Sequence, residues 1–401
     1  MGGIVIVGGG QAGVSLAFKL RDLGHDGEVT LIGEEPDPPY QRPPLSKAYL
    51  LGEMTRERLY LRPAEAYDDK GISLRTDARV TGIDPKAKTL NLGGETLAYD
   101  HLALTTGAVP RRLPVEMGGD LDGLYPVRTL ADIDRMEPEF REGAKVLIIG
   151  GGYIGLEAAA VAAKKGLQVL LIEAGPRILA RVAAPETSDY FRAAHEAKGV
   201  EIRENTALLR LLGDGSVTGA ELSDGSQVEA DFAILGIGID PDTALAETAG
   251  LALENGIKTD ARGATSVPGI WAAGDCASFP YWGRRIRLES VQNAIDQAEA
   301  VAANILGAKA DYVPHPWFWS DQYDIKLQIA GLSDGYGHVV VRETAKGRSH
   351  WYFKDARLIA LDAMNDPRAY MVGKRLIEAE KSPDPAIIAD GEADLRPLLK
   401  A

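Results

Sequence analysis

The hydrophobic and polar positions of the chain repeat one arrangement twice. A short apolar run, IVIV at 4–7 and VLII at 146–149, leads in each case into the pattern G-G-G-x-x-G. Apolar residues then recur at helical spacing, through 13–23 in the first copy and 154–164 in the second. A second apolar run follows each helix and ends in acidic residues, EVTLIGEE in the first copy and QVLLIEA in the second. Each copy therefore predicts a β-α-β unit in a parallel sheet.

The remaining pattern predicts further strands, and near the C-terminus it changes to the alternation of antiparallel strands. Three further segments, at 101–111, 231–242 and 269–277, each contain an apolar run that leads into a glycine. From about Pro314 aromatic residues accumulate, and the segments HVVVRET, RSHWYFKD and RLIALDAM alternate as antiparallel strands do. The tail from Ser382 predicts a surface helix or loop.

The apolar stretch 146–163 is long enough to suggest a membrane span. It contains Glu157 and three consecutive glycines, however, so a strand, a tight turn and a buried helix explain it better. No basic segment precedes the first apolar run, which argues against a secretion signal. We expect a cytoplasmic protein without a membrane partner.

The composition of the chain disfavours several classes of binding and catalytic chemistry. The chain has 401 residues, enough for two or three domains, and a formal net charge of −14, which disfavours general nucleic-acid binding. Its six histidines show no metal-ligand spacing, so we expect no protein-held metal. Cys276 is the only cysteine, which excludes an intramolecular disulfide and fits a reducing compartment. A lone cysteine is more often a small packing residue than a reactive thiol.

The two glycine patterns predict two dinucleotide sites. Glycine allows a sharp turn and a close backbone approach to a pyrophosphate, which the free N–H groups of a helix start can bind. The glycines with this role are Gly8, Gly10 and Gly13 in the first copy and Gly150, Gly152 and Gly155 in the second. Two such sites on one chain suggest a bound flavin and a nicotinamide that exchanges.

An acidic residue after the second strand of each copy is placed to bind a ribose. Glu34 has this place in the first copy and Glu173 in the second. Glu173 would also repel a 2′-phosphate, which predicts NADH rather than NADPH, although Arg177 nearby weakens the inference.

Many enzymes of this plan pass electrons to a cysteine pair, C-x4-C, in the first domain. This chain has YQRPPLSKAYL at 40–50 instead, so thiol and cysteine-peroxide chemistry are excluded there.

Five further segments carry a family resemblance: PPLSK (43–47), GGGYIGLE (150–157), AAGDCA (272–277), ESVQNA (289–294) and PWFWSDQYDIKLQIAGLS (316–333). Together they resemble the oxygenase-coupled NADH-dependent ferredoxin reductases, the family of putidaredoxin reductase and of the reductase of biphenyl dioxygenase. The resemblance covers nearly the whole chain, except the stretch from about Glu378.

The resemblance implies an α/β, glutathione-reductase-like fold with two dinucleotide-binding domains and a C-terminal α+β domain. The implied division is an FAD-binding domain in two segments, 1–110 and 239–315, an NADH-binding domain at 111–238 and the C-terminal domain at 316–401. The implied reaction passes electrons from NADH through FAD to a 2Fe-2S ferredoxin. That ferredoxin serves a cytochrome P-450 monooxygenase or a ring-hydroxylating dioxygenase.

The same resemblance implies the cofactor contacts. Those for FAD are Gly8, Gly10, Ala12, Gly13, Glu34, Lys47, Val80, Arg128, Asp275, Val291 and Trp319. Those for NADH are Gly150, Gly152, Tyr153, Ile154, Gly155, Glu157, Glu173 and Gly238. Asp275 also has its own argument, since an acid after a strand-end glycine can accept hydrogen bonds from ribityl hydroxyls.

Three residues are expected to act catalytically: Lys47, Glu157 and Trp317. Lys47 follows two prolines that stiffen its approach, and a cation beside the flavin would stabilise the reduced ring. Glu157 would pair with it, since buried lysines are rare unless paired. Trp317 and Trp319 are core residues by default, but the family places an aromatic residue here against flavin and nicotinamide.

The expected protein partner is the ferredoxin. A local basic segment, Arg284, Arg285 and Arg287, is a candidate docking site, and the alternative is a scattered solvated surface. Two other functions stay open. One is an NADH-dependent flavoenzyme acting on rubredoxin, a quinone or oxygen, and the other is a non-catalytic flavoprotein resembling apoptosis-inducing factor.

Overall fold

The computed structural model describes residues 3–400, and these residues form two compact units. Unit 1 comprises residues 3–42, 55–109 and 239–316, and unit 2 comprises residues 43–54, 110–238 and 317–400. Residues 43–54 and the C-terminal segment thus belong to the same unit as residues 110–238. The division into FAD-binding, NADH-binding and C-terminal domains stays a prediction.

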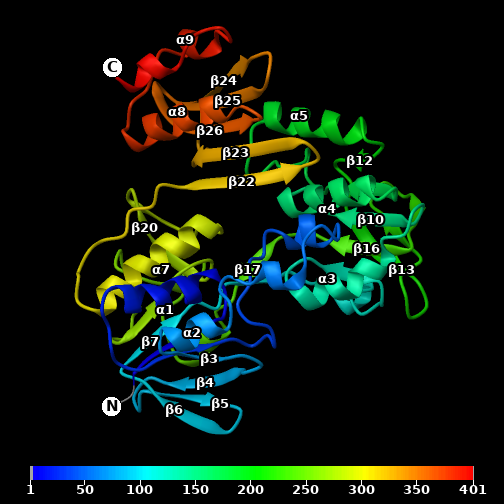
Figure 1. The fold of residues 1–401 in the computed structure, drawn as a ribbon. Helices are drawn as coiled ribbons and strands as arrows, with labels where there is room; N and C mark the ends of the chain where they lie inside the picture. The colour runs from blue at the N-terminus through cyan, green and yellow to red at the C-terminus, as the bar shows by residue number, and fades with distance from the viewer. Residues whose placement is uncertain (1–2, 401) are drawn as a thin grey trace. The chain divides into compact units, whose positions relative to one another are not determined.

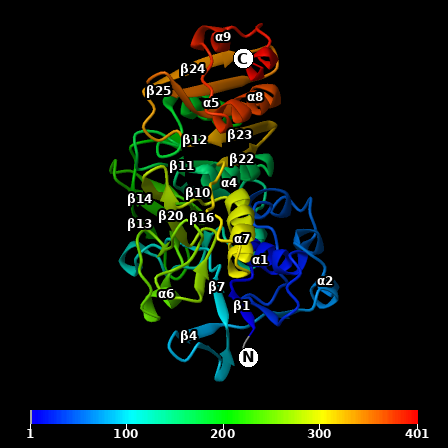
Figure 2. The same cartoon turned by 90° about the vertical axis from the view of Figure 1, so that its left-hand side faces the viewer.

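Unit 1 is built on a parallel sheet with the strand order β19-β7-β1-β2-β3. Its strands are β1 (Ile4–Val7), β2 (Val29–Ile32), β3 (Ile72–Arg75), β7 (His101–Leu104) and β19 (Ile270–Ala272). All four side chains of β1 are buried, as its apolar run predicts for a strand covered on both faces. Helices α1 (Gln11–Asp22) and α7 (Val291–Ile305) lie side by side in both ribbon views and share one core with Ile4 and Ile6 (Figures 1 and 2).

Smaller elements complete unit 1. An antiparallel sheet has the order β4-β5-β6, and its side chains share a core with Val5 and Val7, on the other face of β1. The remaining bounds are β4 (Val80–Asp84), β5 (Thr89–Leu92), β6 (Glu95–Ala98), β8 (Ala108–Pro110), β17 (Ile239–Pro241), β18 (Ile257–Lys258), β20 (Ala277–Tyr281), β21 (Arg284–Ile286), α2 (Glu65–Asp69), α6 (Ala244–Thr248) and the helical turn η2 (Arg56–Leu59).

Unit 2 contains the second β-α-β unit, again in a parallel sheet, with the order β12-β11-β10-β16-β9. The strands are β9 (Leu124–Pro126), β10 (Lys145–Ile149), β11 (Gln168–Ile172), β12 (Glu201–Arg203) and β16 (Phe232–Leu235). The helices are α3 (Leu130–Met136), α4 (Tyr153–Lys164) and α5 (Pro185–Glu196), with the turns η1 (Leu45–Tyr49), η3 (Val115–Met117) and η4 (Glu137–Glu139). A small antiparallel sheet contains β13 (Leu208–Leu212), β14 (Gly219–Leu222) and β15 (Gln227–Glu229).

The C-terminal part of unit 2 is an antiparallel sheet with the order β22-β23-β26-β25-β24. The bounds are β22 (Trp317–Gln322), β23 (Ile325–Gly331), β24 (His338–Glu343), β25 (Arg348–Lys354), β26 (Arg357–Met364), α8 (Pro367–Glu378), α9 (Pro385–Ala389) and η5 (Arg396–Leu399). The three alternating segments of the sequence are therefore strands, as predicted. The tail contributes to the core through Ile388 and Leu395, so it is not only a surface element.

The apolar stretch 146–163 divides as predicted into strand β10, a glycine turn and helix α4. Within residues 3–400, no helix combines the length and the apolarity needed to cross a membrane.

Candidate active site

The first glycine loop has the shape that a pyrophosphate site requires. Gly8 has a positive φ of 121°, and a Cβ added to Gly13 would lie 2.1 Å from the carbonyl oxygen of Gly8. Both positions therefore exclude a side chain. A Cβ on Gly10 would meet nothing within 4 Å, so the backbone is open to a ligand there. Gly10 caps α1 without a side-chain hydrogen bond, which leaves N–H groups of the first turn for an anion.

Other predicted FAD contacts of unit 1 surround this loop. Ala12 is buried, and a Cβ on Gly274 would lie 3.0 Å from its Cβ and 3.9 Å from that of Ala294 in the first turn of α7. Asp275 directly follows Gly274, and Val291 begins α7. The structure thus brings Ala12, Asp275 and Val291 into the neighbourhood of one loop.

Glu34 lies on the surface. Its side chain is 62% exposed and pairs at 2.8 Å with Arg79, which is 74% exposed and precedes the buried Val80. Such an exposed pair is weak, and the ribose contact of Glu34 stays a prediction. The adjacent Glu35 is instead bound by Arg42 at 2.7 Å and by the hydroxyl of Tyr40.

The second glycine loop repeats the geometry of the first. Gly150 has a φ of 109°, and a Cβ on Gly155 would lie 2.1 Å from the carbonyl oxygen of Gly150. A Cβ on Gly152 would meet no atom within 4 Å. Ile154 is 43% exposed in the first turn of α4. The ring of Tyr153 packs 5.0 Å from that of Phe318, and burial raises the pKa of its hydroxyl.

Glu173 is held against this loop by two backbone N–H groups. Its Oε2 accepts a hydrogen bond from Gly151 at 2.7 Å, and its Oε1 accepts one from Gly175 at 2.7 Å. Arg177 is engaged elsewhere, because its guanidinium donates to the Ser188 hydroxyl and to the Ala183 carbonyl. The preference for NADH that Glu173 suggests stays a prediction.

Gly238 and Arg128 lie in the same unit. Gly238 has a φ of 105°, and the guanidinium groups of Arg111 and Arg181 lie within 4 Å of the position that its Cβ would occupy. Arg128 is half-buried and directly precedes the capping residue of α3.

A buried polar cluster joins Lys47 to Glu157. Glu157 lies on α4, which packs against both η1 and β22, and it is only 2% exposed. Its Oε2 accepts from Lys47 Nζ at 2.6 Å and from Ser46 Oγ at 2.7 Å, and its Oε1 accepts from Ser320 Oγ at 2.7 Å. Lys47 also donates to the carbonyl of Pro43 at 3.1 Å. The predicted pairing of Lys47 with Glu157 is therefore present, and three donors compensate the buried carboxylate.

Sequence reasoning missed the two serines of this cluster. Ser46 and Ser320 are nearly or completely buried, and both stand inside segments that the sequence had singled out, PPLSK and PWFWSDQYDIKLQIAGLS. A serine has too many ordinary roles for its type alone to indicate this one.

The two faces of β22 make different contacts. Phe318 and Ser320 contact Tyr153 and Glu157 of α4, so they share one face of the strand. Trp317 and Trp319 lie 5.6 Å apart between ring centroids, and Lys374 lies 5.7 Å above the ring of Trp317. Both tryptophans are half-buried, so neither is an ordinary core residue.

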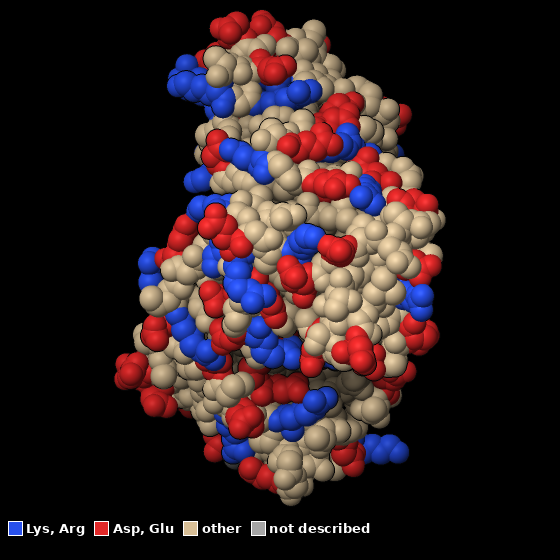
Figure 3. All heavy atoms as spheres, turned by 90° about the vertical axis from the view of Figure 1, so that its right-hand side faces the viewer, with Lys and Arg blue, Asp and Glu red and all other residues tan. Residues whose placement is uncertain are grey.

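The contacts of Arg285 and Arg287 count against the docking role expected of them. Arg285 donates to the carbonyls of Thr259 and Ser278 at 2.9 and 2.6 Å, and Arg287 pairs with Glu289 at 2.6 Å. Their side chains are only 20% and 11% exposed, so both act within unit 1. Figure 3 shows basic and acidic side chains interspersed over the visible face. The docking site, including Arg284, stays a prediction.

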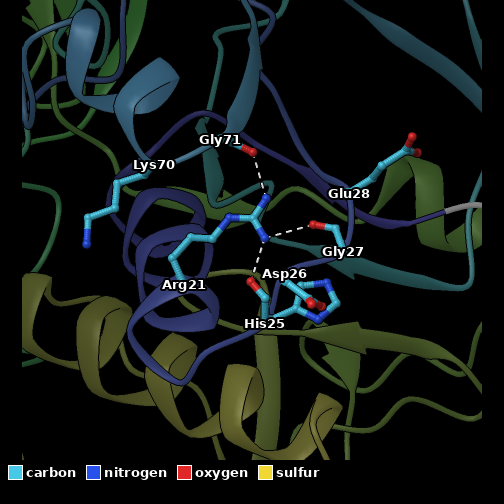
Figure 4. Close-up of a pocket in the computed structure, with 7 residues that line it drawn as sticks. All are labelled: Arg21, His25, Asp26, Gly27, Glu28, Lys70 and Gly71. Atoms are coloured by element: carbon cyan, nitrogen blue, oxygen red, sulfur yellow. Dashed lines mark hydrogen bonds between the residues drawn. The ribbon is translucent and has the colours of Figure 1, made fainter.

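A surface hollow of about 380 Å³ lies at the other end of α1 from the glycine loop (Figure 4). The guanidinium of Arg21, which lines the hollow, donates hydrogen bonds to the carbonyls of His25, Gly27 and Gly71 at 2.6 to 2.7 Å. Charges of both signs line the rest, from Asp26, Glu28 and Lys70. None of the predicted site residues lies in it.

Comparison with known proteins identifies the family. The family model described as pyridine nucleotide-disulphide oxidoreductase matches residues 2–298, and the model described as reductase C-terminal matches residues 317–399. A ferredoxin–NAD(P)+ reductase from a Sphingomonas species is 46% identical over 99% of this chain and 96% of its own length. A rubredoxin–NAD+ reductase from Ectopseudomonas oleovorans is 38% identical over 91% of this chain and 96% of its own length.

A solved structure agrees with these sequence matches. The covalent putidaredoxin reductase–putidaredoxin complex contains a chain that is 39% identical, with a TM-score of 0.96, covering 100% of this chain and 98% of that chain. The predicted fold class is thereby confirmed. The chain belongs to the pyridine nucleotide-disulphide oxidoreductase family and, within it, to the ferredoxin reductases, which are FAD-dependent oxidoreductases.

Proposed function

We propose that this enzyme oxidises NADH and passes the electrons through bound FAD to a 2Fe-2S ferredoxin, which supplies a cytochrome P-450 monooxygenase or a ring-hydroxylating dioxygenase. FAD supplies the step that a side chain cannot perform, because it accepts a hydride and returns single electrons. The chain's own residues bind and orient the two dinucleotides.

The two loops divide this binding between them. Gly8, Gly10 and Gly13 hold the pyrophosphate of FAD, and Glu34 binds its ribose. The matching loop at Gly150–Gly155 and the carboxylate of Glu173 hold NADH. The open backbone positions at Gly10 and Gly152 support this proposal, because each admits a phosphate where a Cβ would interfere.

One observation supports the proposal that electron transfer uses no thiol. The segment 43–54 contains no cysteine, and it pairs the ammonium of Lys47 with the carboxylate of Glu157. Cys276 is fully buried, and burial raises the pKa of its thiol, so the reactive thiolate is disfavoured. With FAD bound, the ammonium of Lys47 would supply a positive charge to the flavin, and Glu157 would hold Lys47 in place.

Anaerobic mixing of the FAD-loaded protein with NADH tests this function. Rapid bleaching of the flavin absorbance, followed by reoxidation when a 2Fe-2S ferredoxin is added, supports it. Absence of bleaching would overturn it and leave the non-catalytic alternative.

We also propose that the protein is cytoplasmic. Subcellular fractionation with an antibody tests this location.

Rubredoxin is the second candidate acceptor, because a relative of 38% identity is named a rubredoxin–NAD+ reductase. Steady-state NADH oxidation with matched concentrations of a 2Fe-2S ferredoxin and a rubredoxin separates the two. A higher kcat/KM with the ferredoxin supports the first proposal. A higher kcat/KM with rubredoxin, a quinone or oxygen would replace it.

A further inference from the structure

A continuous line of hydrogen bonds leads from Glu157 to the edge of the C-terminal sheet. Ser320 Oγ lies 2.7 Å from Glu157 Oε1, and Gln322 Nε2 lies 3.2 Å from Ser320 Oγ. The Oε1 atom of Gln322 lies 2.8 Å from His195 Nε2, and the hydroxyl of Tyr323 lies 2.9 Å from His195 Nδ1. Ser320, Gln322 and His195 are completely buried.

The chemistry of each group fixes the direction of this line. A carboxylate only accepts, so the hydroxyl of Ser320 must donate its proton to Glu157. The oxygen of Ser320 then accepts from the amide nitrogen of Gln322, which turns the amide oxygen of Gln322 toward His195. His195 must therefore carry its proton on Nε2, and its Nδ1 accepts from Tyr323. Every donor in the line points toward Glu157.

Two features keep the outer end of the line in place. Burial lowers the pKa of His195, so its neutral form is favoured and one ring nitrogen stays free to accept. Tyr323 has a positive φ of 57°, which bulky residues seldom adopt, and its ring packs edge-on against that of His195 at 5.0 Å. The turn after β22 thus holds an unfavoured backbone conformation while its hydroxyl lies against His195.

We propose that Ser320, Gln322 and His195 are positioning residues, which hold Glu157 in the single orientation that presents Oε2 to Lys47 during hydride transfer. The assignment rests on the proposed function, in which Lys47 acts on the flavin. Ser320 occupies Oε1, so Oε2 is left to Ser46 and Lys47. Without the line, the carboxylate can rotate and share its charge differently between these donors.

Three variants of the full-length, FAD-loaded protein test the assignment. Ser320→Ala removes the donor to Glu157, and His195→Phe keeps a ring while it removes the donor to Gln322. Anaerobic stopped-flow reduction at saturating NADH should slow about tenfold in Ser320→Ala, since a lost hydrogen bond to a charged group has an effect of this order. It should slow less in His195→Phe, because the bond lost there is to the neutral amide of Gln322 and Ser320 still donates to Glu157. The dissociation constant for NADH should change little. His195→Gln retains an amide donor and should restore most of the rate.

Ser349→Ala is the matched control. Ser349 is also a fully buried serine of the C-terminal sheet, and it accepts from Trp351 at 3.1 Å without contacting Glu157. NADH should reduce the flavin of Ser349→Ala at the wild-type rate. Equal rates for Ser320→Ala, His195→Phe and Ser349→Ala would overturn the assignment, as would failure of His195→Gln to exceed His195→Phe.

Nitrogen NMR of the histidine rings gives a readout that does not depend on turnover. The His195 signal, identified by its loss in His195→Phe, should show a proton on Nε2 in the wild type, and Gln322→Leu should abolish that preference. A proton on Nδ1 in the wild type would contradict the assignment. If wild-type flavin is not reduced by NADH, the proposed function fails. If it is reduced but the variants match it, only the positioning role fails.

Discussion

Lys47 Nζ lies 2.6 Å from Glu157 Oε2, although the two residues are 110 positions apart in the chain. The contact ties the short segment 43–54 to the helix that follows the second glycine loop. Glu157 is 2% exposed and Lys47 is 18% exposed, so the pair is largely screened from water. Such a pair is costly to break from one side, because the remaining charge stays buried.

Glu157→Gln should therefore weaken both stability and hydride transfer. The amide leaves Lys47 unpaired and places an NH2 group against one of the serine donors. We expect a loss of about 3 kcal/mol in the free energy of unfolding, the usual scale for removing one partner of a buried pair. Calorimetric melting of the wild type, Glu157→Gln, Lys47→Met and the double variant measures it as a thermodynamic cycle. Strict additivity of the two single effects would contradict the pairing.

Glu173→Gln should relax the preference for NADH. The carboxylate is fixed by the N–H groups of Gly151 and Gly175, where it would repel a 2′-phosphate. Removing its charge should lower the ratio of kcat/KM for NADH over NADPH about tenfold or more, because like-charge contacts cost several kcal/mol. Arg177→Lys is the control and should leave the ratio nearly unchanged. An unaltered ratio in Glu173→Gln would show that another residue sets the preference.

Two buried groups of the C-terminal sheet should oppose each other in their effect on stability against pH. Burial raises the pKa of Asp362 to about 6 and lowers that of His350 to about 3, and the hydroxyl of Thr187 bonds to both side chains. For Asp362 the folded state binds the proton more tightly, so its contribution falls as pH rises from about 4 to 6. For His350 the unfolded state binds the proton more tightly, so its contribution is full above about 6.5 and falls as pH drops toward 3.

Asp362→Asn should remove the contribution of Asp362 to the pH dependence of stability and leave that of His350. Over pH 4 to 6 this variant should gain stability relative to the wild type as pH rises, by about 2 kcal/mol in total. His350→Gln should show the opposite trend against the wild type. Melting temperatures measured across this range check both, and parallel pH profiles for all three proteins would contradict the two pKa shifts.

Arg285→Glu should destabilise unit 1 rather than act only on ferredoxin binding. Its guanidinium donates to two backbone carbonyls, and each such charged hydrogen bond contributes about 1.5–3 kcal/mol. We expect a lower melting temperature and an unchanged salt dependence of the KM for ferredoxin. A KM that rises and loses its salt dependence without a change in melting temperature would restore the docking role that the sequence suggested.

Much of the fold could be predicted from local pattern. The runs before Gly8 and Gly150 are uniformly apolar because their strands are covered on both faces, and the C-terminal strands alternate in sequence and pair antiparallel. The pairing of Lys47 with Glu157 could be proposed because a buried lysine needs a partner. The serines and the line through Gln322 to His195 could not, since they depend on how α4, α5 and β22 meet. The bonds of Arg285 to two backbone carbonyls could not be predicted either, since sequence shows a charge but not what the guanidinium contacts, and the docking site stays a prediction.

The central claim is that electrons pass from NADH to ferredoxin without a thiol. Its most direct test is Cys276→Ala, which removes the only cysteine of the chain, a buried side chain that contacts the carbonyls of Leu104 and Ala273. The FAD-loaded variant should be bleached by NADH anaerobically and reoxidised by a 2Fe-2S ferredoxin at rates within about twofold of the wild type, as for a modest change in packing. Loss of bleaching or of ferredoxin reduction in a folded variant that retains FAD would contradict the account.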